Sequence, residues 1–148
     1  EVTEGSFTVY FEGIPGANNM FTANVDGASY TADEIVITTS IVNQYPRITI
    51  TTTRGDQRME LTFPATVTAG TFDMGTEIID GDEIVAYYTP VVGTSITYVS
   101  SPGSLDITNY DIPNGIIEGT FNFTAIDATG QDTTVYQITN GEFLIVLP

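Results

Sequence analysis

Carboxylates are the only side chains in this sequence from which acid–base chemistry could be built. The 148 residues include 19 aspartates and glutamates and three arginines, but no histidine, cysteine or lysine. The nucleophile–base pairs that join serine or cysteine to histidine or lysine cannot be assembled from them, nor can histidine or cysteine zinc sites. A pair of carboxylates about 5–10 Å apart, as in glycosidases, remains, but no two acids are marked out for that role. We therefore expect no enzymatic activity.

Calcium is the one cofactor that this composition permits, because oxygen ligands suffice to bind it. The densest run of such ligands is formed by Asp80, Asp82 and Glu83, and a second candidate is Asp127 with Asp132. Neither run has the alternating oxygen ligands and late glutamate of an EF-hand loop. Aspartate and glycine are also common in solvated turns. We favour turns at both places and keep calcium as the alternative.

Arg54-Gly55-Asp56 spells the tripeptide that integrins bind, and it lies between two strand-like runs, at the tip of an expected hairpin. Glycine and aspartate are ordinary turn residues, and a string of three residues arises readily by chance, so we favour a simple turn. The only cations, Arg47, Arg54 and Arg58, all fall within this hairpin. They could bind an acidic partner, but we expect them to pair with acids of the chain itself.

Tyrosines and threonines suggest two further surfaces. Five tyrosines could form an aromatic platform for a sugar: Tyr10, Tyr45, Tyr87, Tyr88 and Tyr98. Such rings are more often core residues with the hydroxyl at the surface, and we favour that interpretation. The threonine-rich run at 49–53 is compatible with an ice-binding face. Its spacing does not recur at a fixed period, which favours an ordinary exposed strand.

Two-residue periodicity runs through nearly the whole chain and predicts the elements that would position these side chains. In residues 116–126, Phe121 and Phe123 fall on the apolar parity and Glu118 and Thr120 on the polar one, as in a half-buried antiparallel strand. The same pattern predicts strands over 6–12, 20–25, 29–31, 35–41, 47–53, 58–63, 71–74, 84–89, 95–99, 105–110, 116–126, 133–139 and 142–147.

Roughly ten to twelve short strands at turn spacings of 8–12 residues predict an all-β fold, either an antiparallel β-sandwich or a flattened barrel. The last third, from residue 104, is expected to form a four-stranded meander. Asn140-Gly141 separates its last two strands and predicts a hairpin, because this pair supplies both positive φ values of a type I′ turn. The final run, 143–147, is apolar on both parities, which predicts a central strand.

One domain is expected for a chain of 148 residues. Residues 1–19 are expected to form an N-terminal strand and loop, which could be an exchangeable extension, and residues 20–148 the body. A formal net charge of −16 repels nucleic acid and anionic lipid. No run of 18 apolar residues exists, so no membrane span is expected. We interpret Glu1 as the start of a mature, processed chain.

Several short blocks carry a family resemblance. Residues 103–111 (GSLDITNYD), 117–125 (IEGTFNFTA) and 138–143 (ITNGEF) follow one another as "ItxyD", "isGTFsFxa" and "iTnGxF" blocks, and residues 21–27 and 70–72 add weaker matches. Together they resemble a family of uncharacterised envelope lipoproteins of Bacteroidota. The resemblance implies an exported, envelope-associated β domain whose lipid anchor belongs to the precursor, at the extracellular or outer-membrane surface. The blocks are turn glycines and core aromatics, so they indicate a fold and not an activity.

Three functions are compatible with these observations. The first is a non-enzymatic envelope or surface domain that acts through protein–protein contacts. The second is a subunit of an extracellular assembly that polymerises or docks by β-strand exchange. The third is a β-barrel that binds a small molecule or carbohydrate. We favour the first, because the resemblance and the missing catalytic side chains both point to it.

Overall fold

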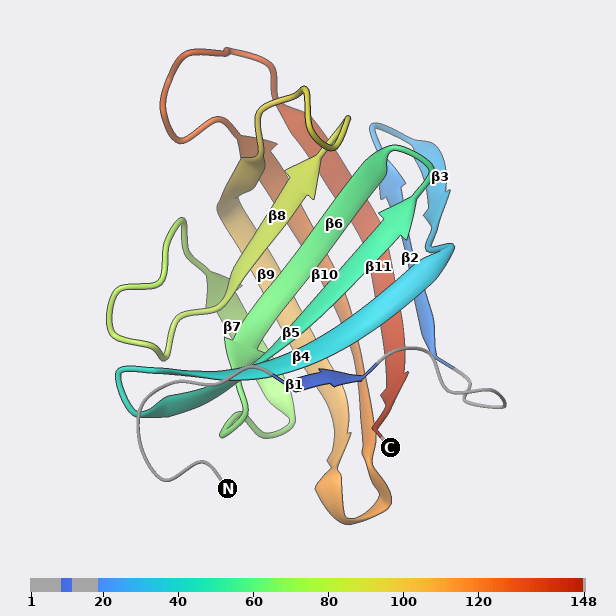
Figure 1. Ribbon diagram of the computed structural model, residues 1–148, viewed down its shortest axis with the longest axis vertical. Coiled ribbons are helices and arrows are strands. Elements are labelled where there is room, and N and C mark those ends of the chain that lie inside the picture. Colours follow the sequence, from blue (N-terminus) through green and yellow to red (C-terminus); the bar gives the residue numbers. More distant parts are fainter. Residues whose placement is uncertain (1–8, 12–18, 148) are drawn as a thin grey trace.

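The computed structural model describes residues 9–11, by their backbone alone, and residues 19–147 (Figure 1). Apart from one 3-10 turn, η1 (Ile112–Asn114), the regular structure of these residues is all strand. The strands are β1 (Val9–Phe11), β2 (Met20–Val25), β3 (Ala28–Thr31), β4 (Glu34–Val42), β5 (Tyr45–Arg54), β6 (Gln57–Pro64), β7 (Gly70–Met74), β8 (Val85–Thr89), β9 (Tyr98–Asp111), β10 (Ile116–Ile126) and β11 (Tyr136–Val146). The prediction of an all-β fold is confirmed.

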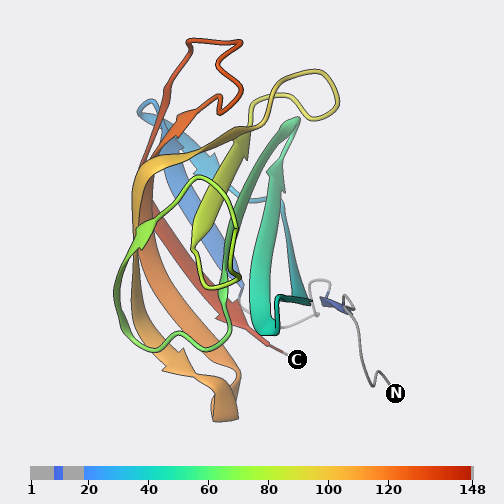
Figure 2. The same ribbon diagram turned by 90° about the vertical axis from the view of Figure 1, so that its left-hand side faces the viewer.

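The strands form one antiparallel sheet that curls over on itself. Its order is β1-β4-β5-β6-β8-β9-β10-β11-β2-β3, with β7 paired to β9 beside this path. Figures 1 and 2 show two layers: a front layer of β4, β5, β6 and β8, and a back layer of β9, β10, β11 and β2. The prediction of an antiparallel sandwich or flattened barrel is confirmed, in the form of a half-barrel made by one curled antiparallel sheet.

Side chains from both layers fill the space between them. The ring of Phe121 packs against Phe21 and Phe143, with centroids 5.0 and 6.3 Å apart. Phe63 of the front layer stacks on Phe143 of the back layer at 6.5 Å. All four rings are at most 3% exposed. The interior formed by the described residues is a packed core, which argues against a lipocalin-like cavity.

The N-terminal strand joins the sheet at its edge. β1 pairs with residues 37–39 of β4 and with no other described strand. The strand expected over 6–12 is thus observed over Val9–Phe11, and the rest of it lies outside the described residues. The division into an extension, 1–19, and a body, 20–148, stays a prediction. None of the helical structure in the described residues is long and apolar enough to cross a membrane.

The two clearest strand predictions agree with the structure. β10 spans Ile116–Ile126, as the alternation predicts, and its apolar parity is buried. β11 contains the apolar run 143–147 up to Val146 and is central, because it pairs with β10 on one side and with β2 on the other.

The hairpin expected at Asn140-Gly141 is wrong. β11 runs unbroken through this pair, and both neighbouring strands pair with it before and after. Asn140 has a φ of 52°, and the pairing register shifts here, so the pair forms a β-bulge. The left-handed backbone conformation of Asn140, which the sequence suggested for a turn, is used in the bulge instead. Ile138 and Phe143, on either side, both stay in the core.

The two strands expected over 95–99 and 105–110 are one strand, β9. Its first residues pair with β8 of the front layer, and its middle pairs with β7. Pro102 lies where the register with β10 shifts, so the ladder needs no N–H from it. The strand expected over 133–139 begins only at Tyr136 and continues as β11.

Candidate functional site

The loop between β7 and β8, residues 75–84, packs against a buried arginine of the front layer; we call it the acidic loop. Arg47 lies on the outward parity of β5 but is only 1% exposed. Its Nη1 donates to the Gly81 carbonyl at 2.6 Å and its Nη2 to the Thr62 hydroxyl at 3.1 Å. Burial lowers the pKa of the guanidinium, while the nearby Glu83 carboxylate acts in the opposite direction. Arg47 thus fastens the acidic loop to the sheet.

This role of Arg47 is not evident in the sequence. The prediction that Arg47 pairs with acids of the chain is wrong, because its hydrogen-bond partners among the described residues are a carbonyl and a hydroxyl. The only local signal is an arginine on the threonine-rich parity of a strand. Its Nε has no hydrogen-bond partner among the described residues.

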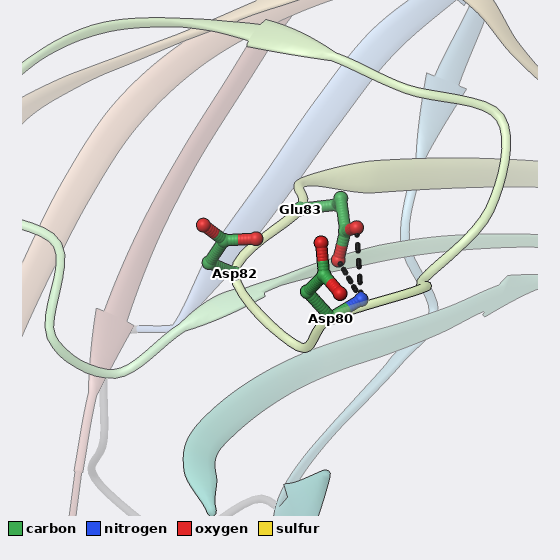
Figure 3. Close-up of side chains that lie close together, drawn as sticks. All are labelled: Asp80, Asp82 and Glu83. Atoms are coloured by element: carbon green, nitrogen blue, oxygen red, sulfur yellow. Dashed lines mark hydrogen bonds between the residues drawn. The ribbon is translucent and has the colours of Figure 1, made fainter. Parts of the chain in front are cut away.

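The predicted calcium ligands lie together in the acidic loop (Figure 3). Oxygen atoms of Asp80, Asp82 and Glu83 all lie within 4.8 Å of one another. Calcium takes six to eight oxygens at about 2.3–2.6 Å, so three carboxylates would leave several positions to carbonyls or water. The side chains of Asp80 and Asp82 are exposed. Calcium binding here stays the untested alternative to a turn.

Glu83 already has a role within the acidic loop. Its carboxylate accepts the N–H of Asp80 at 3.0 and 3.2 Å and the N–H of Gly81 at 3.0 Å. The hydrogen bond from Asp80 is the main reason why the pKa of Glu83 falls to about 2. A carboxylate that accepts several backbone N–H groups stabilises a turn. This arrangement is the turn that the sequence favours for residues 80–83.

The second acidic pair, Asp127 and Asp132, accepts hydrogen bonds that hold the loop between β10 and β11. Asp127 is 6% exposed and accepts the N–H groups of Thr129, Gln131 and Asp132 at 2.9–3.0 Å. The Thr129 hydroxyl also donates to it, at 2.7 Å, and is the main cause of its lowered pKa. The Asp132 carboxylate accepts the hydroxyl of Tyr98. These contacts favour a turn over a calcium site.

Arg54-Gly55-Asp56 lies at the tip between β5 and β6, as expected, but it is tethered. The Gly55 N–H donates to the Asp33 carboxylate at 3.0 Å, and Arg54 Nη1 donates to the Thr31 carbonyl at 3.4 Å. From the other side, the Val92 N–H donates to the Asp56 carbonyl at 2.8 Å. An open depression of about 600 Å³ borders the tip. The internal contacts support the simple turn.

The tyrosines do not gather into one platform. Tyr88 and Tyr98 are buried, as expected for core rings, and each packs edge-on against Tyr136, with centroids 5.0 and 4.9 Å apart. The Tyr88 hydroxyl donates to Gln57. Tyr45 is 39% exposed and lies beside Gly81 in the acidic loop. The side chain of Tyr10 lies outside the described residues. Tyr136, which joins the buried rings, was missed in the sequence.

The outer face of the back layer carries a row of polar side chains across six strands. From β7 to β3 the successive pairing partners are Thr71, Asp106, Thr120, Glu142, Thr22 and Thr31. Asp73 and Glu118 share this face, two residues along β7 and β10. We call these eight residues the polar face. None of the three arginines belongs to it, because they lie in β5 and β6 of the front layer.

Comparison with protein families gives one match. Residues 17–147 match the family model of the domain of unknown function DUF6252. The chain belongs to the DUF6252 family. No curated protein matches this DUF6252 domain, and no solved structure does. This match confirms that the chain belongs to a domain family of unknown function. The resemblance to lipoproteins of Bacteroidota stays a prediction.

Two of the recognised blocks have a packing role in this DUF6252 domain. A Cβ on Gly141 would lie 2.5 Å from the ring and the carbonyl of Phe121, and a Cβ on Gly119 would lie 2.8 Å from the ring of Phe143. Real Cβ atoms essentially never come so close, so both positions need glycine to admit a core aromatic ring. The blocks determine core packing and leave the activity open.

Proposed function

We propose that this DUF6252 domain is a non-enzymatic domain of the cell envelope that works by binding another protein. The polar face is the observation that carries the proposal. It crosses six strands and includes the carboxylates of Asp73, Asp106, Glu118 and Glu142, but none of the arginines. A surface with one sign of charge favours partners of the opposite sign and disfavours others. The partner that fits is a protein surface rich in lysine and arginine.

The state of three carboxylates outside the polar face supports binding rather than catalysis. Glu83, Asp127 and Asp132 accept hydrogen bonds in two separate loops, and their pKa values are lowered. A general acid instead needs a carboxyl whose pKa is raised. Together with the lack of histidine, cysteine and lysine, these lowered pKa values support the proposal that the domain is not an enzyme.

Export and attachment to the envelope are part of the same proposal. They are supported by the resemblance of residues 103–111, 117–125 and 138–143 to lipoproteins of Bacteroidota. In this proposal a lipid on the precursor holds the domain at the extracellular or outer-membrane surface. The net charge of −16 favours solubility and keeps the domain away from anionic lipid.

Carbodiimide cross-linking tests the protein contact, because it joins carboxylates to amines and the 148 residues contain no lysine. Apart from the terminal amine, an adduct from the polar face must join an amine outside this chain, and its mass distinguishes a protein partner from an aminolipid. We mix the domain with the envelope fraction of the cells that produce it. We expect adducts that join this face to partner lysines. The D106N/E142Q variant should lower the adduct yield about tenfold, because two attractive charges are lost.

The matched control is D80N/D82N, which removes the same charge from the acidic loop and should keep the adduct yield of the original protein. The protein-contact proposal is wrong if both double variants give equal yields. It is also wrong if the purified domain turns over a substrate and loses that activity when two carboxylates are replaced.

A further inference from the structure

We propose that β1 is exchanged between two copies of this domain, so that Val9–Phe11 of each copy pairs with β4 of the other. The acceptor is the edge of β4 at residues 37–39, where β1 pairs in the described chain. This surface belongs to the front layer and is distinct from the polar face of the back layer. The inference therefore stands apart from the proposed function, and the partner is a second copy of the chain.

The edge of β4 needs a covering strand. All nine residues of β4 pair with β5 on one side, whereas the described partner on the other side is β1 at three residues. From Ile35 to Val42 the strand has no charge, proline or glycine, and five of these eight residues are isoleucine or valine. Proteins usually protect such edges with charges, proline or bulges, because an uncharged β-branched edge pairs readily with another strand.

β1 provides this cover weakly. Its described part consists of three residues, and β4 is its one partner among the described strands. β1 is the first strand in the sheet order, whereas β2, the next strand in the chain, lies next to its other end (Figure 1), so these two do not pair as a hairpin. A short strand at a sheet edge separates at little cost in free energy.

In the exchanged dimer, the hydrogen bonds between β1 and β4 keep the register that they have within one chain. When β1 leaves β4, the β1 of a second copy can make the same main-chain hydrogen bonds in the same register. Because the two copies donate β1 to each other, the exchange closes into a two-fold dimer. Two chains of net charge −16 repel each other. Contact at residues 35–42, which carry no charge, keeps this repulsion smallest, and salt should strengthen the dimer.

Cysteine pairing tests the exchange cleanly, because the sequence contains no cysteine. Tyr10 and Thr38 are directly opposite in the register, at a spacing that suits a disulfide. We prepare Y10C and T38C separately, mix them in a thiol–disulfide buffer and measure the covalent heterodimer by mass spectrometry. We expect it to be about tenfold more abundant than with V42C in place of T38C, because Val42 lies four residues, about 13 Å, along the same strand.

Two outcomes would overturn the exchange: equal heterodimer yields with T38C and V42C, or a Y10C/T38C double variant that forms only a disulfide within one chain and sediments as a single copy at every concentration and salt. If T38C does not fold, V9C with T39C provides a second opposed pair. Failure here leaves the cross-linking test of the polar face unaffected, because that test concerns the other layer.

Discussion

At the residue scale, the main result is that several carboxylates of this acidic chain bind to its own backbone. Glu83 accepts N–H groups in the acidic loop, and Asp127 accepts them in the loop between β10 and β11. Both lie in runs that resemble cation sites in the sequence. Charge-assisted hydrogen bonds from backbone N–H groups stabilise a loop strongly. An acidic run in such a sequence therefore identifies a turn as readily as a metal site.

The pH dependence of stability tests this role of Glu83. Its pKa is about 2, below the ordinary value of 4.5, so its stabilisation is present above pH 4.5 and is lost as the pH falls through about 2. We expect E83Q to have a lower melting temperature than the original protein at pH 7, and the difference to close between pH 4.5 and 2. Circular dichroism across pH 2–7 measures this.

D82N is the control, because the described residues include no hydrogen bond to the Asp82 side chain while its position in the loop is adjacent. Its melting temperature should follow the original protein across the same pH range. If the deficit of E83Q were as large at pH 2 as at pH 7, the backbone contacts of Glu83 would not be its source.

At the element scale, β11 shows how tertiary pairing overrides a local turn signal. Asn140-Gly141 is a strong hairpin signal, yet both β10 and β2 pair with β11 on either side of it. Folding back at this pair would remove Phe143 and Ile145 from the core, where each is at most 1% exposed. A bulge accommodates the left-handed Asn140 and keeps both residues buried.

Replacement of Gly141 tests the packing of this bulge. In G141A the added Cβ would lie 2.5 Å from the ring and carbonyl of Phe121, and overpacking of this kind costs about 1–3 kcal/mol. We expect the free energy of unfolding, from urea denaturation, to fall by that amount. G75A is the matched control, because the nearest atom would be 3.9 Å away, and it should change stability by less than about 0.5 kcal/mol. Equal losses in the two variants would contradict the packing role.

At the scale of the whole molecule, charge is distributed unevenly between the two layers. The three arginines lie in β5 and β6 of the front layer, and Arg47 is buried there. The polar face of the back layer carries only negative charge among its eight residues. With a net charge of −16, self-repulsion acts against the compact state.

Salt should therefore stabilise this protein. Added sodium chloride screens repulsion between exposed carboxylates, and the melting temperature should rise by about 2–4 °C for each kcal/mol of repulsion removed. Scanning calorimetry between low and moderate salt measures the slope, which should be smaller for D106N/E142Q because two of the repelling charges are gone. A melting temperature that falls with added salt would show instead that attractive ion pairs dominate.

The sequence by itself determined the all-β class, the inward and outward faces of the strands and the bounds of β10. These follow from two-residue periodicity, which is a local property of a pleated strand. It also shows that histidine, cysteine and lysine are absent. The resemblance blocks, in turn, agreed with membership of an uncharacterised domain family.

Only the tertiary structure decided which strands are neighbours, that Asn140-Gly141 is a bulge and that β9 continues past Pro102. It also decided that Arg47 is buried against Gly81, 34 residues away, and that Tyr98 bonds to Asp132, also 34 residues away. In such contacts, the local sequence around one residue does not indicate which distant residue it will contact. They form because the curled sheet brings distant strands together, and most buried polar groups in a folded protein are hydrogen-bonded.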